Sequence, residues 1–237
     1  MYVLTAADFA DTGQWRLILK IRPDGLEACL ENTLHKEIEP QPLCKVEWAS
    51  DCGSVCKKIE ETVYNNPRLL DDFATRVILY EARTLFIPKD IAEATAGSEE
   101  ELYKKIYDAE APDIMSDTNE EITAVWSTPP GVKSFLLRTF PGARITCNLM
   151  DNFRELKKKI NEERLERDNK GLGENRITLL EDIREKDVDL ILMQGTQLLS
   201  AATHNYQTDE DINKLENNLL AAYDLGREDL EIYRQNK

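Results

Sequence analysis

Cysteine and histidine are the residue types in this sequence that could bind a metal ion or form a catalytic pair. Cys52 and Cys56 are four residues apart in a segment predicted to be helical, so both thiols could face one metal ion. His35 and His204 are distant in sequence from these cysteines and from each other. A tetrahedral zinc site needs four ligands, and a Cys–His pair needs adjacent partners. We therefore predict ordinary thiols, no metal site and no catalytic residue.

Short catalytic motifs are also missing. The sequence contains no P-loop, no Rossmann glycine pattern, no HExxH and no Gly-x-Ser-x-Gly. Asp11-Thr12-Gly13 resembles a phosphate motif, but it precedes its predicted strand instead of following it, so we expect a capped turn. The sequence favours a protein that is not an enzyme but leaves the question open.

The net charge limits the classes of partner. The chain has 237 residues and a formal charge of −15, whereas nucleic acid binding depends on Lys and Arg that neutralise phosphates. The most basic stretch, Lys157 to Arg167, alternates with glutamates at helical spacing, which predicts a solvated helix face. We expect a protein partner rather than nucleic acid or a membrane; the sequence leaves the oligomeric state open.

Several features favour an intracellular protein. There is no apolar run of roughly 18 residues, the length that a transmembrane helix needs. The first residues lack the basic segment of a secretory signal. The five cysteines are an odd number and are scattered, which is typical of the reducing cytoplasm.

The predicted secondary structure is a mixture of strands and helices in a repeated order. Trp15, Leu17, Leu19 and Ile21 alternate with polar residues, as in a half-buried strand, and Pro23-Asp24-Gly25 supplies a turn, with Gly25 accepting a positive φ. Three strands, a helix and a strand are expected over residues 15–80 and again over 176–233. Between them we expect a strand pair at 76–87, helices at 98–107 and 132–140, an acidic loop at 109–121, strands at 122–126 and 143–148, and a helix from residue 151.

Three segments resemble a bacterial family of unknown function with an actin-like ATPase, ribonuclease-H-like fold. They are DFATRVILYEARTLFIPKDI, VDLILMQGTQLLSAATHNYQTDEDI and NNLLAAYDLGREDLEIY. The resemblance implies an α/β protein of two duplicated ribonuclease-H-like halves, with mixed sheets flanked by helices, packed around a cleft. We place the halves at residues 1–121 and 122–237. A fold of this kind does not by itself imply an activity.

The resemblance directs attention to two hairpin loops, one in each half. Active members of the fold place Asp-x-Gly there, so that a carboxylate faces Mg²⁺ and backbone N–H groups face the phosphates. In the first half, Asp24 lies directly beside Gly25, and Pro23 removes a donor. In the second half, Asp182 is present but no glycine follows it. We interpret both loops as ordinary hairpin turns.

A nuclease of this fold would need carboxylates on its first and fourth strands to hold two metals. The first strand, WRLILKI, contains none. Asp189 lies in an apolar strand, VDLILMQG, but one carboxylate cannot hold two metals. We expect Asp189 to lie at a strand edge or to point outward.

Three functional hypotheses follow. The leading one is a non-catalytic actin-like domain, a pseudo-enzyme without a cofactor that binds or scaffolds other proteins. The alternative is a divergent ATPase or phosphotransferase in which Asp24, Gly25 and Asp182 bind Mg-ATP. The third and weakest is a nuclease.

Overall fold

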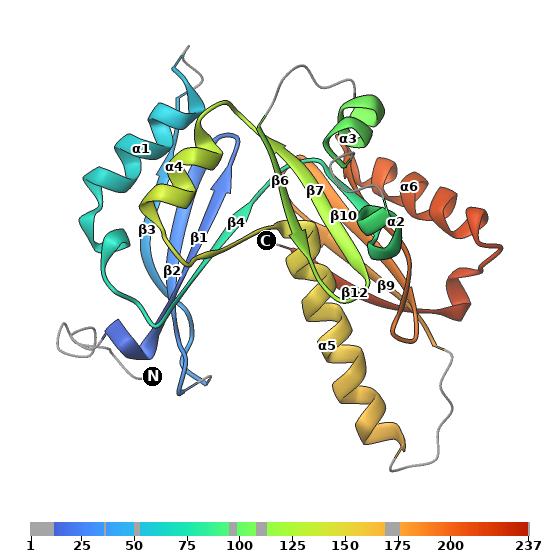
Figure 1. Ribbon diagram of the computed structural model, residues 1–237. Coiled ribbons are helices and arrows are strands. Elements are labelled where there is room, and N and C mark those ends of the chain that lie inside the picture. Colours follow the sequence, from blue (N-terminus) through green and yellow to red (C-terminus); the bar gives the residue numbers. More distant parts are fainter. Residues whose placement is uncertain are drawn as a thin grey trace. The chain divides into compact units, whose positions relative to one another are not determined.

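The computed structural model describes residues 12–35, 37–49, 53–94, 99–107, 113–168 and 176–236. The chain divides into two compact units, Met1–Asn148 and Leu149–Lys237. Each unit contains a sheet built around a central strand, with helices against it (Figure 1).

The first unit contains a five-stranded sheet in the order β3-β2-β1-β4-β8. Its strands are β1 (Trp15–Arg22), β2 (Gly25–Asn32), β3 (Gln41–Glu47), β4 (Thr75–Tyr80) and β8 (Arg144–Cys147), and its helices are α1 (Val55–Asn65) and α4 (Val132–Thr139) with the 3-10 turns η1 (Thr12–Gln14) and η2 (Pro67–Leu70). Strand β1 pairs antiparallel with β2 and parallel with β4, and β4 pairs parallel with β8.

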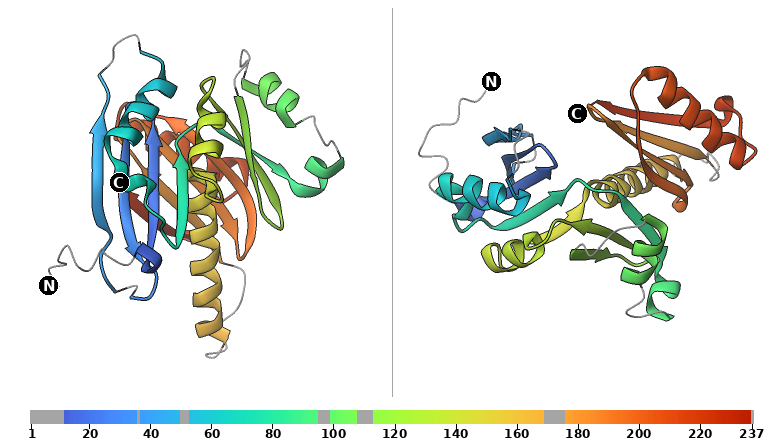
Figure 2. Two further views of the ribbon diagram at one scale, coloured as in Figure 1. Left: turned by 60° about the vertical axis from the view of Figure 1, so that its left-hand side comes forward. Right: turned by 90° about the horizontal axis from the view of Figure 1, so that it is seen from above.

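Hydrophobic alternation explains the central strand of this sheet. Trp15, Leu17, Leu19 and Ile21 are all at most 2% exposed, as the period of two predicts. Helices α1 and α4 lie side by side against the sheet (Figures 1 and 2), where the rings of Tyr64 and Phe135 meet edge to face with centroids 6.1 Å apart. The sequence offers Ser50 or Asp51 as the cap of this first helix, and both lie outside the described residues.

A second, three-stranded sheet is inserted between β4 and α4. It consists of β5 (Thr84–Pro88), β6 (Asp113–Thr118) and β7 (Ile122–Thr128) in the order β5-β7-β6, with α2 (Lys89–Ala94) and α3 (Glu99–Tyr107). Its core contains Ile87, Ala92, Tyr103 and Val125. The expectation of a loop over 109–121 is wrong, because β6 occupies much of it. As an edge strand, β6 is held by backbone pairing to β7 and buries only Met115, so its sequence lacks the expected alternation.

The second unit repeats the pairing pattern of the first. It contains α5 (Asn148–Asp168), β9 (Ile177–Ile183), β10 (Asp187–Gln194), β11 (Gln197–Asn205), α6 (Asp209–Ala222), η3 (Arg227–Asp229) and β12 (Leu230–Asn236). The sheet order is β11-β10-β9-β12, with β9 antiparallel to β10 and parallel to β12. The repeated order of three strands, a helix and a strand is therefore confirmed.

The two faces of this four-stranded sheet contact different helices (Figure 2). On one face, Leu179, Val188 and Leu190 pack against Ile212 of α6. On the other face, Asn152 of α5 bonds to side chains of β9 and β10. Thr208 is a favourable helix-capping residue in the sequence, and α6 does begin directly after it. The Asp211 carboxylate accepts the Thr208 N–H at 3.0 Å.

The boundary between the compact units falls later than the expected one at residues 121 and 122. Strands β6 and β7, on either side of residue 121, pair with each other. Strand β8 then returns to the five-stranded sheet beside β4. The units consequently divide between Asn148 and Leu149.

Candidate functional site: a buried arginine between two aspartates

In the hairpin between β1 and β2, Asp24 lies beside Arg22 and next to Gly25. The Asp24 carbonyl accepts the Trp48 N–H at 2.7 Å, and its carboxylate Oδ1 lies 3.6 Å from Arg22 Nε. Gly25 does not have the positive φ that we expected, since among the described residues only Gly131, Gly142 and Gly195 combine glycine with a positive φ. A Cβ at Gly25 would lie 2.5 Å from the Val46 carbonyl oxygen, so Gly25 is needed for close approach of β3.

The hairpin between β9 and β10 carries two aspartates that face each other across the strands. Asp182 of β9 and Asp189 of β10 are direct partners in the antiparallel register. They are 1% and 0% exposed. The expectation that Asp189 lies at a strand edge or points outward is therefore wrong, because β10 is an inner strand. Direct cross-strand partners project to the same face of a sheet, so two carboxylates lie close together in a buried place.

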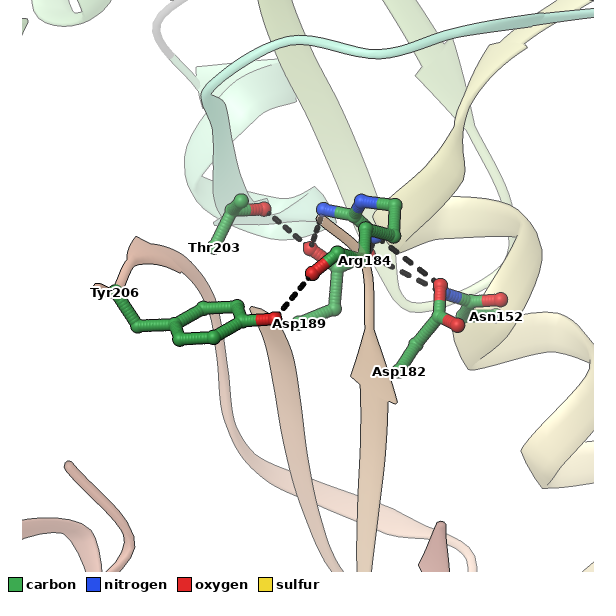
Figure 3. Close-up of polar contacts among 6 residues, drawn as sticks. All are labelled: Asn152, Asp182, Arg184, Asp189, Thr203 and Tyr206. Carbon is green, nitrogen blue, oxygen red and sulfur yellow. Dashed lines mark hydrogen bonds and ion pairs between the residues drawn. The ribbon is translucent and has the colours of Figure 1, made fainter. Parts of the chain in front are cut away.

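Arg184, in the turn between these strands, forms ion pairs with both carboxylates (Figure 3). Its Nη1 lies 3.0 Å from Asp182 Oδ2 and 2.7 Å from Asp189 Oδ2. Its Nη2 lies 2.9 Å from Asp189 Oδ1, which makes the contact with Asp189 bidentate. The Arg184 side chain is only 10% exposed, so this is a largely buried ion triad.

Neighbouring elements supply further hydrogen bonds to this cluster. Asn152 of α5 donates its Nδ2 to Asp182 Oδ2 at 2.8 Å and to Asp189 Oδ2 at 3.2 Å. Thr203 of β11 donates its hydroxyl to Asp189 Oδ1 at 2.6 Å. The Tyr206 hydroxyl donates to the Arg184 carbonyl, which holds the turn from below (Figure 3). Four separate elements therefore position the cluster.

Both oxygens of Asp189 are engaged by the Arg184 guanidinium and by polar neighbours. Each oxygen of Asp189 already accepts two hydrogen bonds, from Arg184 and from Asn152 or Thr203. Within the described residues, no group of three or more His, Cys, Asp or Glu side chains is arranged to hold a metal ion. A carboxylate pair would otherwise suit Mg²⁺ or Ca²⁺, which prefer oxygen ligands.

A second buried carboxylate pair lies on the opposite face of the same sheet. Glu181 of β9 and Glu216 of α6 are 0% and 1% exposed. Arg234 Nη2 lies 2.6 Å from Glu181 Oε2, and Arg227 Nε lies 3.2 Å from Glu216 Oε1. Burial, and then the nearby Glu181 carboxylate, raise the pKa of Glu216, while Arg227 and Arg234 oppose the rise. Sequence reasoning missed this pair.

The other predicted residues do not assemble into a site. Cys56 contacts Glu60 Oε1 at 4.0 Å, and its predicted partner Cys52 lies outside the described residues. His35 is exposed and its Nδ1 lies 3.2 Å from Glu37 Oε1. Burial lowers the pKa of His204, and the Asp189 charge opposes this shift. Thr12 and Gly13 form the turn before β1, as expected, and Asp11 lies outside the described residues.

The basic stretch of α5 agrees with a solvated helix face, since Lys158 Nζ lies 3.8 Å from Glu162 Oε1, one turn away. No helix in the described part of the chain is both long and apolar enough to cross a membrane.

One sequence signal could have identified the aspartate cluster. In the segment from Leu180 to Leu190, charged residues interrupt two strands that are otherwise apolar. A charge inside such a strand is tolerated only when it is paired. The oppositely charged Arg184 between the two aspartates supplies the partner.

Comparisons with known proteins give the family and the fold. A family model described as "Protein of unknown function (DUF3822)" matches residues 5–233. No curated protein matches the sequence. A structure from Bacteroides thetaiotaomicron, of actin-like ATPase fold and unknown function, is similar at 16% identity and a TM-score of 0.78, covering 97% of this chain and 85% of that one. The chain therefore has the actin-like ATPase, ribonuclease-H-like fold that its sequence predicted.

Two further structures are more distant. The PilM–PilN type IV pilus biogenesis complex matches with a TM-score of 0.41 and 15% identity, over 86% of this chain and 65% of that one. An exopolyphosphatase from Cytophaga hutchinsonii matches with a TM-score of 0.38 and 9% identity, over 85% of this chain and 53% of that one. Neither similarity is strong enough to indicate a function.

Proposed function

Because the chain belongs to the DUF3822 family of proteins of unknown function, we propose its role from its own residues: it is a non-catalytic actin-like domain that binds or scaffolds other proteins. The observation that carries this proposal is the Arg184 guanidinium between Asp182 and Asp189. We place this role in the bacterial cytoplasm. The net charge of −15 supports a protein partner, because nucleic acid and anionic membranes repel an acidic chain.

Electrostatics supports the loss of a metal-phosphate site in the second unit. An active site of this fold needs a carboxylate oxygen that is open to Mg²⁺. Here the guanidinium takes that place through three charge-assisted hydrogen bonds to Asp182 and Asp189. At an effective dielectric constant of about 20, Arg184 would repel a divalent ion about 4 Å away by about 8 kcal/mol, which offsets the attraction of one of the two carboxylates at the same distance. Mg²⁺ would therefore compete with Arg184 for the oxygens of Asp182 and Asp189.

The hairpin of the first unit supports the same proposal. Pro23 has no N–H to offer a phosphate. The Asp24 carboxylate is near Arg22, and Gly25 is required by the approach of Val46. Gly25 therefore has a structural role that needs no nucleotide, and Arg22 lies where a cation would approach Asp24.

Calorimetric titration of the full chain with Mg-ATP tests this proposal. We expect no saturable heat and no rise in the melting temperature, whereas a nucleotide at about 100 times its Kd would stabilise the protein by about 2.7 kcal/mol. The informative variant is Asp24→Asn, because the Asp24 side chain is 60% exposed and its replacement leaves the fold intact.

The matched control is Asp72→Asn, whose side chain is 98% exposed and belongs to neither hairpin. Saturable binding that Asp24→Asn weakens and Asp72→Asn preserves would establish the divergent ATPase or phosphotransferase instead. The nuclease hypothesis is disfavoured because strand β1 contains no carboxylate.

A further inference from the structure

Strand β11 is an edge strand without charge. It lies at the end of the sheet order β11-β10-β9-β12, so within the described part of the chain only β10 pairs with it. Its nine residues, QLLSAATHN, contain no Asp, Glu, Lys or Arg, in a chain in which 32% of residues are charged. Burial lowers the pKa of His204, which favours its neutral form.

The β3 and β12 edges of the two large sheets are protected in the usual way. An unpaired strand edge can pair with another chain, and proteins prevent this with proline and charged residues. Strand β3 carries Pro42, Lys45 and Glu47, and β12 carries Glu231 and Arg234. Strand β11 has none of these devices, and the residues from Leu198 to His204 are all partly exposed.

An irregularity limits the part of β11 that can pair. The register with β10 shifts at Leu199, which has no partner there. The Leu199 carbonyl instead accepts the Tyr223 hydroxyl at 2.6 Å. Beyond this bulge, Ser200 to Asn205 pair in regular register with β10. This six-residue segment is the part of the edge that is regular enough to accept another strand.

We propose that the Ser200–Asn205 edge of β11 pairs antiparallel with the same edge of a second copy of this chain. Antiparallel pairing of one strand with its own copy is two-fold symmetric, so a single segment supplies both sides of the interface. This inference rests on the proposed binding role and names a partner for it.

Charge selects a second copy over a basic peptide. Two chains of net charge −15 repel each other, so they approach most easily where both surfaces are neutral. A basic peptide would instead prefer an edge that carries acidic residues, such as the Glu47 end of β3. The uncharged β11 edge fits a copy of itself.

Light scattering coupled to gel filtration of the full chain, over a dilution series, tests the proposal. We expect a particle with twice the mass of one chain, which dissociates on dilution to particles with the mass of one chain. The Ala202→Lys variant should have the mass of one chain at every concentration, because each copy then places a positive charge at the paired edge and the two charges repel each other. Gln41→Lys places the same charge on the edge of β3, which already carries Lys45, and should leave the dimer unchanged.

Circular dichroism checks that the variants are folded, and Ala201→Lys, on the other face of the strand, replaces Ala202→Lys if the latter unfolds. If the wild-type chain has the mass of one chain at all concentrations, the inference is overturned. It is also overturned if the dimer persists in both Ala202→Lys and Ala201→Lys. A dimer that also binds Mg-ATP would overturn the proposed function but keep this interface. A monomer that binds no nucleotide would overturn this interface but keep the proposed function.

Discussion

Replacement of Arg184 by alanine should strongly destabilise the second unit. The change leaves Asp182 and Asp189 facing each other at 1% and 0% exposure without their shared cation. Removing one partner of a buried ion pair costs about 3–5 kcal/mol, because a buried charge is left uncompensated. Total stabilities are only about 5–15 kcal/mol, so much of the stability of this unit should be lost.

Hydrogen exchange of the full chain, read by mass spectrometry, measures this loss locally. For amides of β9 and β10, the free energy of opening should fall by about 3–5 kcal/mol. The protection of amides in β1 and β2 should not change. Tryptophan fluorescence gives an independent control, since all three tryptophans lie in the first unit. Urea unfolding followed by fluorescence should therefore be nearly unaffected.

Two further variants show whether charge is the cause. Arg176→Ala removes a more exposed ion pair with Glu231 in the same unit, and should cost less than about 1 kcal/mol. Adding Asp182→Asn and Asp189→Asn to the Arg184 variant removes the buried charges and should recover part of the protection. If Arg184→Ala costs no more than Arg176→Ala, the view of Arg184 as a structural cation is refuted.

Three other predictions concern single residues. Burial and Glu181 raise the pKa of Glu216 above its ordinary 4.5. The free energy of unfolding of the wild type, relative to that of Glu216→Gln, should therefore fall as pH rises from 4.5 through the raised folded-state pKa. Urea titrations at several pH values measure this, and a difference between the two proteins that does not change with pH would contradict it. Gly25→Ala should cost about 1–3 kcal/mol by fluorescence-detected unfolding, because its Cβ would lie 2.5 Å from the Val46 oxygen; an unchanged midpoint would show that β3 moves freely. Thr208→Ala should cost about 1 kcal/mol through the cap of α6, seen as faster exchange in the first turn of that helix, and unaltered exchange there would argue against the cap.

Much of the fold was predictable because it depends on local patterns. The alternation from Trp15 to Ile21 identified β1, and Thr208 identified the start of α6. The repeated element order, together with the resemblance, led to the actin-like fold. Strand β6 was missed because an edge strand that buries little besides Met115 has no periodic signal in its sequence.

The chemistry of the site was only partly predictable. The lack of Asp-x-Gly at Asp182 was evident from the sequence, and it indicated a vacant phosphate loop. That Asp189 is buried and shares Arg184 with Asp182 was not evident, and the expectation for Asp189 was wrong. From the sequence we expected Gly25 to be required for a positive φ. The structure shows that it is required because the Val46 carbonyl oxygen lies where a Cβ would be.

The sequence by itself therefore determined most of the order of the elements, the acidic character of the chain and the lack of short catalytic motifs, because each depends on residues close together along the chain or on composition. Only the tertiary structure decided which charges meet. Asn152, Asp182 and Thr203 come from three separate elements, and their partners depend on strand register and helix packing. Burial then decides how much each pairing affects stability. A carboxylate exposed to water needs no partner, whereas the same carboxylate in the core destabilises the fold if its arginine is removed.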